Sequence, residues 1–201
     1  MSRVLRIEDV EAVPWMAGMT WHPVRMELGL HAFGAAGFSG GPGDFVVEPH
    51  VEAGDGRGHE ELYVVLSGRA TFTLDGSPVD APAGTLVFAS PETHREAVAE
   101  EPGTTVLALG GPPTFEAAGY EWLMRAKPHM TSDPDRAREI LRAGLAELPG
   151  SAAIPYGFAL PEATQGDTDS ARASLAEAIS REPRLRDDAA NEPLLKGVRH
   201  L

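Results

Sequence analysis

The segment from His59 to Gly68, HEELYVVLSG, constrains the fold of this chain more than any other part of the sequence. Its centre is rich in β-branched and aromatic residues, and it ends in Ser67-Gly68, a pair that suits a tight turn between two strands. Side chains two positions apart share one face of a strand, so His59, Glu61 and Tyr63 are expected on the same side. The segment therefore predicts a strand that carries polar groups into the interior of a β structure.

Further short apolar runs, separated by Gly, Pro and Asp, lie on both sides of this segment. Regular short strands with turn signals between them indicate a sandwich or barrel rather than alternating β-α units. Asp75-Gly76 suits a hairpin turn with positive φ, and the stretch from Pro82 to Gly84 interrupts strand pairing. The predicted strands cover residues 24–33, 45–51, 61–66, 70–74, 85–89, 94–98 and 104–109.

The order of Glu61, Gly68, Pro82-x-Gly84 and His94 resembles the two signature segments of the cupin superfamily, over about residues 24–110. The resemblance implies a double-stranded β-helix, or jelly-roll barrel. The superfamily includes metal-dependent dioxygenases, isomerases and decarboxylases, sugar-binding regulators and seed storage proteins, so the fold alone does not select an activity. The stretches GHEELYVVLSG, DAPAGTLVF and TTVLALGG also resemble a group of bacterial cupin proteins.

A metal site inside the barrel is the first functional expectation from this resemblance. His59, Glu61 and His94 are the candidate ligands, with His50 as a fourth. Imidazoles combined with a carboxylate suit Fe(II), Mn(II), Ni(II) or Zn(II), and two imidazoles with one carboxylate form the ligand set of many oxygenases. Because Tyr63 shares the face of Glu61, the predicted ligand pocket consists of Tyr63, Glu61 and His59.

The chain departs from the superfamily pattern directly before this segment. The usual His-x-His pair falls within residues 53–58, where Asp55 and Arg57 stand in place of imidazoles. Two alternatives follow. Either the Gly-rich stretch is an inserted loop and His50-Val-Glu52 replaces the pair, or His59 supplies the imidazole itself.

A structural role for the same residues is also open. On that interpretation His59 pairs with neighbouring carboxylates, Glu61 is neutralised by an arginine such as Arg69 or Arg95, and His94 lies on the barrel rim. Tyr63 then contributes mainly buried area to the core.

The sequence pattern changes after Gly110-Gly-Pro-Pro113, where strands give way to Ala, Leu, Arg and Glu at helical spacing. We expect a cupin β-barrel domain with an N-terminal extension over residues 1–113 and a helical region over residues 114–201. Residues 133–141 and 167–175 align at a spacing of 34, the period of tetratricopeptide repeats. The predicted fold is therefore mainly β plus α, a cupin jelly-roll barrel followed by a small tetratricopeptide-like region, with helices over 115–126, 155–164 and 169–181.

The amino-acid composition limits the kinds of partner that this protein is expected to bind. A formal net charge of -13 disfavours nucleic acids and anionic membranes, because their binding relies on basic side chains. The sequence has no cysteine and no apolar run of membrane-spanning or signal-peptide length, so we expect a cytoplasmic soluble protein.

Three functions remain open at this point. The first is a protein that binds a small molecule in the barrel, with a divalent metal, while the helices contact a second copy or a protein partner. The second is a metal-dependent enzyme of the dioxygenase or isomerase class that uses His59, Glu61 and His94. The third is a structural dimer with a filled barrel. By resemblance to cupins a homodimer is expected, with Trp15 and Trp21 at its interface or closing one barrel end.

Overall fold

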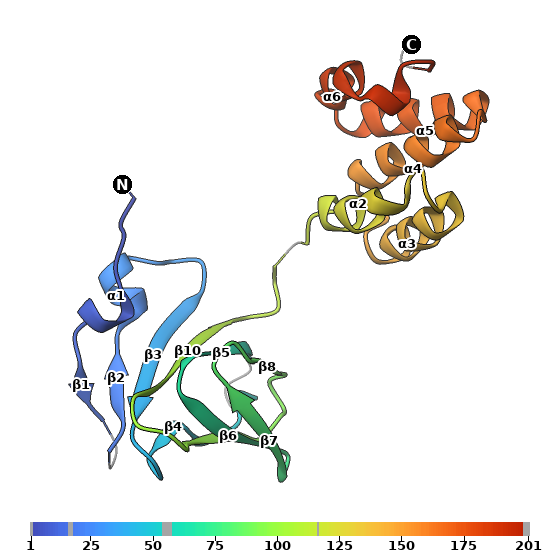
Figure 1. Cartoon of the computed structure of the whole chain (residues 1–201). Helices are drawn as coiled ribbons and strands as arrows, with labels where there is room; N and C mark the ends of the chain where they lie inside the picture. The colour runs from blue at the N-terminus through green and yellow to red at the C-terminus, as the bar shows by residue number, and fades with distance from the viewer. Residues whose placement is uncertain (1, 16–17, 54–57, 116, 199–201) are drawn as a thin grey trace. The chain divides into compact units, whose positions relative to one another are not determined.

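The computed structural model describes residues 2–15, 18–53, 58–115 and 117–198 of the chain (Figure 1). The chain divides into two compact units, Met1–Phe115 and Glu116–Leu201. The first unit contains all ten strands of the described residues, and the second is helical. This confirms the predicted combination of a β structure followed by helices.

The first unit is built from two antiparallel sheets, as expected for a jelly-roll barrel (Figure 1). One sheet has six strands in the order β1-β2-β3-β10-β5-β8, and the other has four in the order β4-β9-β6-β7. The strands are β1 (Val13–Pro14), β2 (Thr20–His22), β3 (Gly34–Gly40), β4 (Phe45–His50), β5 (Glu60–Ser67), β6 (Arg69–Leu74), β7 (Ser77–Pro82), β8 (Leu86–Ala89), β9 (Arg95–Ala99) and β10 (Thr104–Gly111).

Alternating residues of both sheets meet in a common core. Tyr63 and Val65 of β5 are buried, as are Phe72 of β6 and Val106 of β10. The rings of Tyr63 and Phe72 pack with their centroids 5.6 Å apart. Burying a side chain of this size contributes roughly 1.5–3 kcal/mol, so this layer supplies much of the stability of the barrel.

Two parts of the first unit differ from the sequence prediction. Residues 24–33 do not form a strand, because Val24–Leu28 is the helix α1, which ends at Gly29 in the left-handed region with φ of 68°. The strand that follows, β3, has the sequence GAAGFSG, and its small residues gave no β signal. The strand β7 was also missed, since it contains two prolines; it lies at the edge of its sheet, where proline is tolerated.

The N-terminal segment packs on the barrel through a second, smaller core. Val10, Val24 and Ala35 are buried there, and Leu107 and Leu109 of β10 pack against them. The 3-10 helix η1 (Ile7–Asp9) belongs to this segment. These contacts cover the side chains of β3 and β10 that alternate with the residues of the barrel core.

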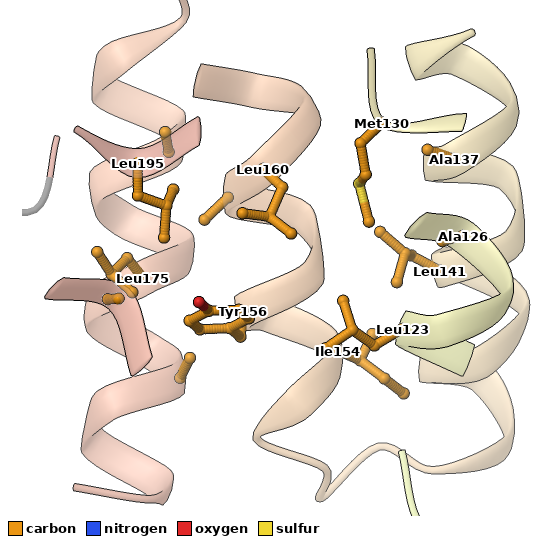
Figure 2. Close-up of a cluster of buried hydrophobic side chains, with 14 of the residues drawn as sticks. Leu123, Ala126, Met130, Ala137, Leu141, Ile154, Tyr156, Leu160, Leu175 and Leu195 are labelled. Carbon is orange, nitrogen blue, oxygen red and sulfur yellow. The ribbon is translucent and has the colours of Figure 1, made fainter. Parts of the chain in front are cut away.

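The second unit consists of short helices around its own hydrophobic core (Figure 2). Its elements are α2 (Tyr120–Ala126), η2 (Lys127–His129), α3 (Pro134–Glu147), α4 (Ala153–Thr164), α5 (Thr168–Arg181), α6 (Leu185–Asn191) and η3 (Pro193–Leu195). Figure 2 shows Leu123, Leu141 and Ile154 pointing toward one another in this core.

The 34-residue spacing is visible in the helices themselves. The helices α3 and α5 begin and end 34 residues apart, and the side chains of Asp133 and Asp167 cap their N-termini by accepting from Arg136 N and Ser170 N. The helices therefore lie close to where the spacing predicts them, while the tetratricopeptide relationship itself stays a prediction. Among the described residues, none of the helices has the length and apolar character that crossing a membrane requires.

Candidate functional site

Four polar side chains meet inside the barrel, and the strand pairing explains why. Glu61 and Tyr63 are alternate residues of β5 and point to the same side, as the sequence predicted. His50 ends β4 and lies opposite Arg95, the first residue of β9, in the register of these two strands. A register irregularity between Val47 and His50 sets the position of the imidazole. The four side chains thus come from three strands and both sheets.

The carboxylate of Glu61 is the centre of this group. Its Oε2 atom accepts a hydrogen bond from the hydroxyl of Tyr63. The same oxygen lies 3.4 Å from Nε2 of His50 and 3.6 Å from Nε of Arg95. Glu61 is therefore held by three groups at once, which fixes the direction of its side chain.

The tautomer of His50 follows from its surroundings. Its Nδ1 atom lies 2.6 Å from the backbone carbonyl oxygen of Glu48, and a carbonyl can only accept, so Nδ1 carries the hydrogen. In the neutral imidazole Nε2 then has its lone pair free. This atom lies 3.4 Å from Glu61 Oε2 and 3.6 Å from Glu52 Oε1. A backbone carbonyl on the far nitrogen is the usual way in which proteins orient a metal-binding histidine.

The pKa values in the group shift in the directions expected for a paired acid and base. Burial alone would raise the pKa of Glu61, but the hydrogen bonds donated by protonated His50 and by Tyr63 outweigh it, and the pKa is lowered. When His50 is protonated, its Nε2 also carries a hydrogen and donates it to Glu61, and this hydrogen bond raises the pKa of His50 against the opposing effect of burial. Burial, together with the nearby charge of Glu61, raises the pKa of Tyr63, so its hydroxyl stays protonated and acts as a donor.

Arg95 is the most deeply buried charged residue of the barrel, with no exposed surface. Its Nη2 atom donates to the carbonyl oxygen of Ser90 over 3.0 Å. Its Nε and Nη1 atoms have no hydrogen-bond partner in the described part of the chain. Of the two arginines considered from sequence for Glu61, Arg95 is thus the one beside it, while Arg69 pairs with Asp80 over 2.7 Å instead.

A group of three ligand atoms in this region lies close enough together to hold a metal ion. One atom each from His50, Glu52 and Glu61 lies within 4.8 Å of the others. Of the predicted ligands, the structure therefore brings together His50 and Glu61. It adds Glu52, which agrees with the alternative in which His50-Val-Glu52 replaces the usual pair. Asp55 and Arg57 lie outside the described residues.

The two other predicted ligands lie elsewhere. His94 is exposed, and its backbone N–H donates to Oδ1 of Asp75 over 3.0 Å, at the residue before β9 begins. Because side chains alternate along a strand, the inward position belongs to Arg95, so the assignment of His94 to the ligand set does not hold in this structure. His59 lies at the margin of the cluster, with Nδ1 3.5 Å from Glu52 Oε2 and a side chain 43% exposed.

An open cavity of about 530 Å³ adjoins the cluster. Glu61 and His59 line it, together with Arg25, His31 and apolar side chains that include Phe33 and Phe38. Tyr63, the third residue of the predicted pocket, is not part of this lining and is almost fully buried. Sequence reasoning missed Arg25, His31 and Phe38, because they come from α1, the following turn and the unpredicted strand β3.

The three side chains of the cluster are donors of the kinds that bind divalent cations. One imidazole and two carboxylates match Mn(II), Fe(II) and Zn(II) in chemical type, and the free Nε2 of His50 faces both acids. The positive charge of Arg95 beside Glu61 opposes a cation but leaves the group with one net negative charge when His50 is neutral. The residues therefore fit a divalent cation in donor type and spacing.

Strands of two facing antiparallel sheets bring Glu61 and His50 close together at one place in the barrel. The N-terminal unit has the two-sheet antiparallel architecture of a jelly-roll barrel. No family model and no curated protein matches this chain.

Several solved structures are similar to a little more than half of this chain. KdgF from a Halomonas species has 19% identity and a TM-score of 0.46, over 56% of this chain and 94% of its own. A cupin protein from Bacteroides fragilis has 19% identity and a TM-score of 0.43, over 58% and 89%. A sugar phosphate isomerase of the cupin superfamily from Silicibacter pomeroyi has 16% identity and a TM-score of 0.45, over 54% and 75%. Identities this low concern the fold and not the activity.

The helical unit contains a second cavity, of about 550 Å³, lined by residues of α2, α4 and α6. Tyr120 and Met124 of α2 are exposed apolar side chains beside it. Tyr156 of α4 is buried at this cavity, and burial, with the charges of Glu192 and Asp188, raises its pKa to about 12. The cavity therefore combines apolar side chains with the acidic Glu182, Asp188 and Glu192 and the basic Lys127 and Arg184.

Proposed function

We propose that the cupin barrel binds a small polar molecule in the cavity at its mouth, beside a divalent cation held by His50, Glu52 and Glu61. One observation supports this proposal above the others. Glu61 belongs both to the three-residue cluster and to the lining of the cavity, so a molecule in the cavity would lie next to the cation. A small cavity with a few convergent polar groups is the common form of a ligand site.

The residues around the cation would have separate tasks. When bound, the cation would act as a Lewis acid toward an oxygen of the ligand. The carbonyl oxygen of Glu48 keeps the lone pair of His50 Nε2 directed at the acids, and the Tyr63 hydroxyl holds Glu61. His59 and Glu61 line the cavity where the polar part of the ligand would lie, and Phe33 and Phe38 would contact its apolar part.

Metal binding tests the proposal. Untagged protein is freed of metal and titrated with Mn(II), Fe(II), Ni(II) or Zn(II), and the bound metal is measured by elemental analysis and calorimetry. We expect close to one ion per chain, at least a tenfold loss of affinity in His50→Ala and Glu52→Gln, and no change in His94→Ala. His94 is a matched control because it is an exposed histidine of the same barrel. Less than about 0.1 metal per chain after reconstitution would contradict the metal part of the proposal.

A metal-dependent enzyme of the dioxygenase or isomerase class is the second candidate. Three protein ligands leave coordination positions open, which catalytic sites need. Of the ligands expected for such an enzyme, Glu61 is in the cluster, His59 lies beside it, and His50 stands in place of His94. A ligand recovered unchanged after incubation with the metal-loaded protein supports binding alone, whereas metal-dependent conversion supports the enzyme.

We also propose that the cavity of the helical unit accepts a segment of a protein partner that carries a basic side chain beside an apolar one. Exposed Tyr120 and Met124 would contact the apolar residue, and Asp188 and Glu192 the basic one. A labelled peptide of alternating Lys and Leu serves as the probe in a polarisation titration. Asp188→Asn should weaken its binding, and Glu177→Gln on α5 should not. Equal binding by both variants would contradict this proposal.

A homodimer through the N-terminal strands is the last proposal. Trp15 is 59% exposed and lies 6.3 Å from Trp21, measured between ring centroids. A large exposed aromatic next to another is typical of the centre of an interface. Sedimentation of the wild type should show two chains and that of Trp15→Glu one. A wild type that sediments as a single chain would exclude the dimer at the concentrations measured.

A further inference from the structure

Within the described residues, the guanidinium of Arg95 is buried without the hydrogen bonds that normally accompany a buried charge. Its side chain has no exposed surface, and among the described residues only Nη2 has a hydrogen-bond acceptor, the carbonyl oxygen of Ser90. Its Nε atom faces Glu61 Oε2 at 3.6 Å, which is beyond hydrogen-bond distance. Buried charges with incomplete hydrogen bonding cost stability. Arg95 therefore does not have the features of a residue retained for stability alone.

The barrel offers a clear contrast in Arg69. This arginine lies at the start of β6, donates two hydrogen bonds of 2.7 Å to Asp80, and is partly exposed. Its pairing is complete and lies at the surface. Arg95 has the opposite arrangement, because it is fully buried, only partly paired, and lies beside Glu61.

Because Arg95 is buried, it can affect a molecule in the cavity only indirectly. Its Nε and Nη1 atoms are closed to solvent, and the residue does not line the cavity, so a molecule in the cavity does not reach it. Glu61 does line the cavity and lies against Arg95. Any effect of Arg95 on the site is therefore transmitted through Glu61 and through its electric field.

The charges of the cluster give the sign of that effect. Glu52 and Glu61 contribute two negative charges, and Arg95 cancels one of them. A divalent cation bound to Glu61 would share this carboxylate with a fixed positive charge in a poorly solvated place, where repulsion is screened weakly. Tyr63 and His50 contact Glu61 directly and not through Arg95, so the direction of the carboxylate does not depend on Arg95 alone.

We propose that Arg95 is a positioning residue that acts through Glu61 as a built-in cation, and that its charge lowers the affinity of the His50, Glu52 and Glu61 cluster for divalent metal ions. The proposal rests on the proposed function, since it concerns the same cluster. It assigns to Arg95 the control of how readily the barrel takes up a metal.

The test compares Mn(II) binding to the full chain, followed by electron paramagnetic resonance of the free ion, in the wild type and in variants of Arg95. Arg95→Met and Arg95→Gln should bind Mn(II) at least about tenfold more tightly than the wild type, because they remove the charge. Arg95→Lys keeps the charge and should stay within about threefold of the wild type. Arg69→Met, an arginine on the neighbouring strand, is the matched control and should not change the affinity.

Damage to the fold and loss of the Arg95 charge would change the affinity for Mn(II) in opposite directions. A merely structural role for Arg95 predicts weaker Mn(II) binding in every variant, with a lower melting temperature. Arg95→Gln keeps a polar side chain in case Arg95→Met does not fold, and circular dichroism checks both. If the wild type binds Mn(II) and the folded Arg95→Met and Arg95→Gln proteins bind it no more tightly, the proposed role of Arg95 is wrong. The proposed metal site would stand.

The same experiment separates this inference from the proposed function. A wild type without Mn(II) binding, beside an Arg95→Met variant that binds it, would support the role of Arg95 and reject the metal site of the native chain. Absence of binding in both proteins would overturn both proposals.

Discussion

At the scale of single residues, the hydrogen bond from Tyr63 to Glu61 should contribute measurably to stability. Tyr63 is 1% exposed, and its hydroxyl donates to a carboxylate that has little access to water. Hydrogen bonds to charged groups contribute about 1.5–3 kcal/mol. We expect Tyr63→Phe to lower the unfolding free energy of the barrel by about that amount in urea denaturation. Tyr120→Phe, at an exposed tyrosine, is the control and should have no effect.

The pair of His50 and Glu61 should give the metal-free protein a characteristic pH dependence. The raised pKa of His50 means that its contribution to stability is complete below 6.5 and is lost as the pH rises through the folded value. The lowered pKa of Glu61 means that its contribution is present above 4.5 and is lost as the pH falls through its folded value. The two contributions overlap between these limits.

His50→Gln removes the pair and should cost most stability in this overlap, by about 1 kcal/mol, the scale of a half-buried charged hydrogen bond. Urea denaturation in the presence of a chelator, repeated from pH 4 to 9, measures the difference between the two proteins. A difference that stays constant across this range would contradict the assignment of the pair.

How far the site could be predicted from sequence also becomes clear at this scale. Alternation along β5 correctly placed Glu61 and Tyr63 on one face, because a strand has a fixed period. The choice between His94 and Arg95 depended on the residue at which β9 begins, and a shift by one residue reverses the face. The contact of His50 with Glu61 depends on a local irregularity of β4 for which the sequence contains no signal.

At the scale of elements, the turn between β5 and β6 is expected to be the most sensitive hairpin of the barrel. Gly68 has a φ of 69°, and a Cβ atom there would lie 2.4 Å from Oγ1 of Thr104 and 2.8 Å from its Cα. Gly68→Ala therefore combines backbone strain with a collision against the neighbouring strand. Gly76 has a φ of 80°, but no atom of the described residues lies within 4 Å of the corresponding position.

The two glycines form a matched pair. Gly76→Ala should cost about 1–2 kcal/mol, the cost of a left-handed conformation for a residue with a Cβ atom. Gly68→Ala should cost clearly more, and thermal denaturation of both variants measures the difference. If the two substitutions lower the stability equally, the residues around Gly68 move away from the added Cβ atom, and the collision with Thr104 has no measurable cost in stability.

Elements whose own residues favour one conformation could be predicted from sequence. Elements whose conformation depends on contacts with distant parts of the chain could not. Asp75 and Gly76 form the expected positive-φ turn, with φ of 47° and 80°. By contrast, the small residues of β3 acquire their conformation from pairing with β10 on one side and β2 on the other. The apolar run that begins at Val24 was predicted to be a strand but forms the helix α1. Val24 is buried against the N-terminal segment.

At the scale of the whole molecule, the two units should unfold as separate cooperative units. The described cluster in the helical unit and the residues packed against it lie within residues 122–198, and those of the barrel unit lie within residues 7–109. A unit with its own hydrophobic core has the main requirement for independent folding. A substitution in one core should therefore shift only the transition of that unit.

Leu175 and Val46 allow a reciprocal test, because both side chains are fully buried, one in each unit. Leu175→Ala should lower the stability of the helical unit by about 2–5 kcal/mol, through lost burial and the cavity that remains. Val46→Ala should lower that of the barrel by a smaller amount, because it removes fewer buried groups. Circular dichroism at a helical wavelength follows the second unit. In a Trp122→Phe background, fluorescence of Trp15 and Trp21 follows the barrel.

Each substitution should move one of the two signals and leave the other within error, and Leu175→Ala should also leave the affinity for Mn(II) unchanged, since the cluster of His50, Glu52 and Glu61 lies wholly in the barrel unit. A joint shift of both signals in either variant would mean that the units unfold together. In that case the helices would stabilise the barrel, and substitutions far from the cluster would affect metal binding through the fraction of folded protein.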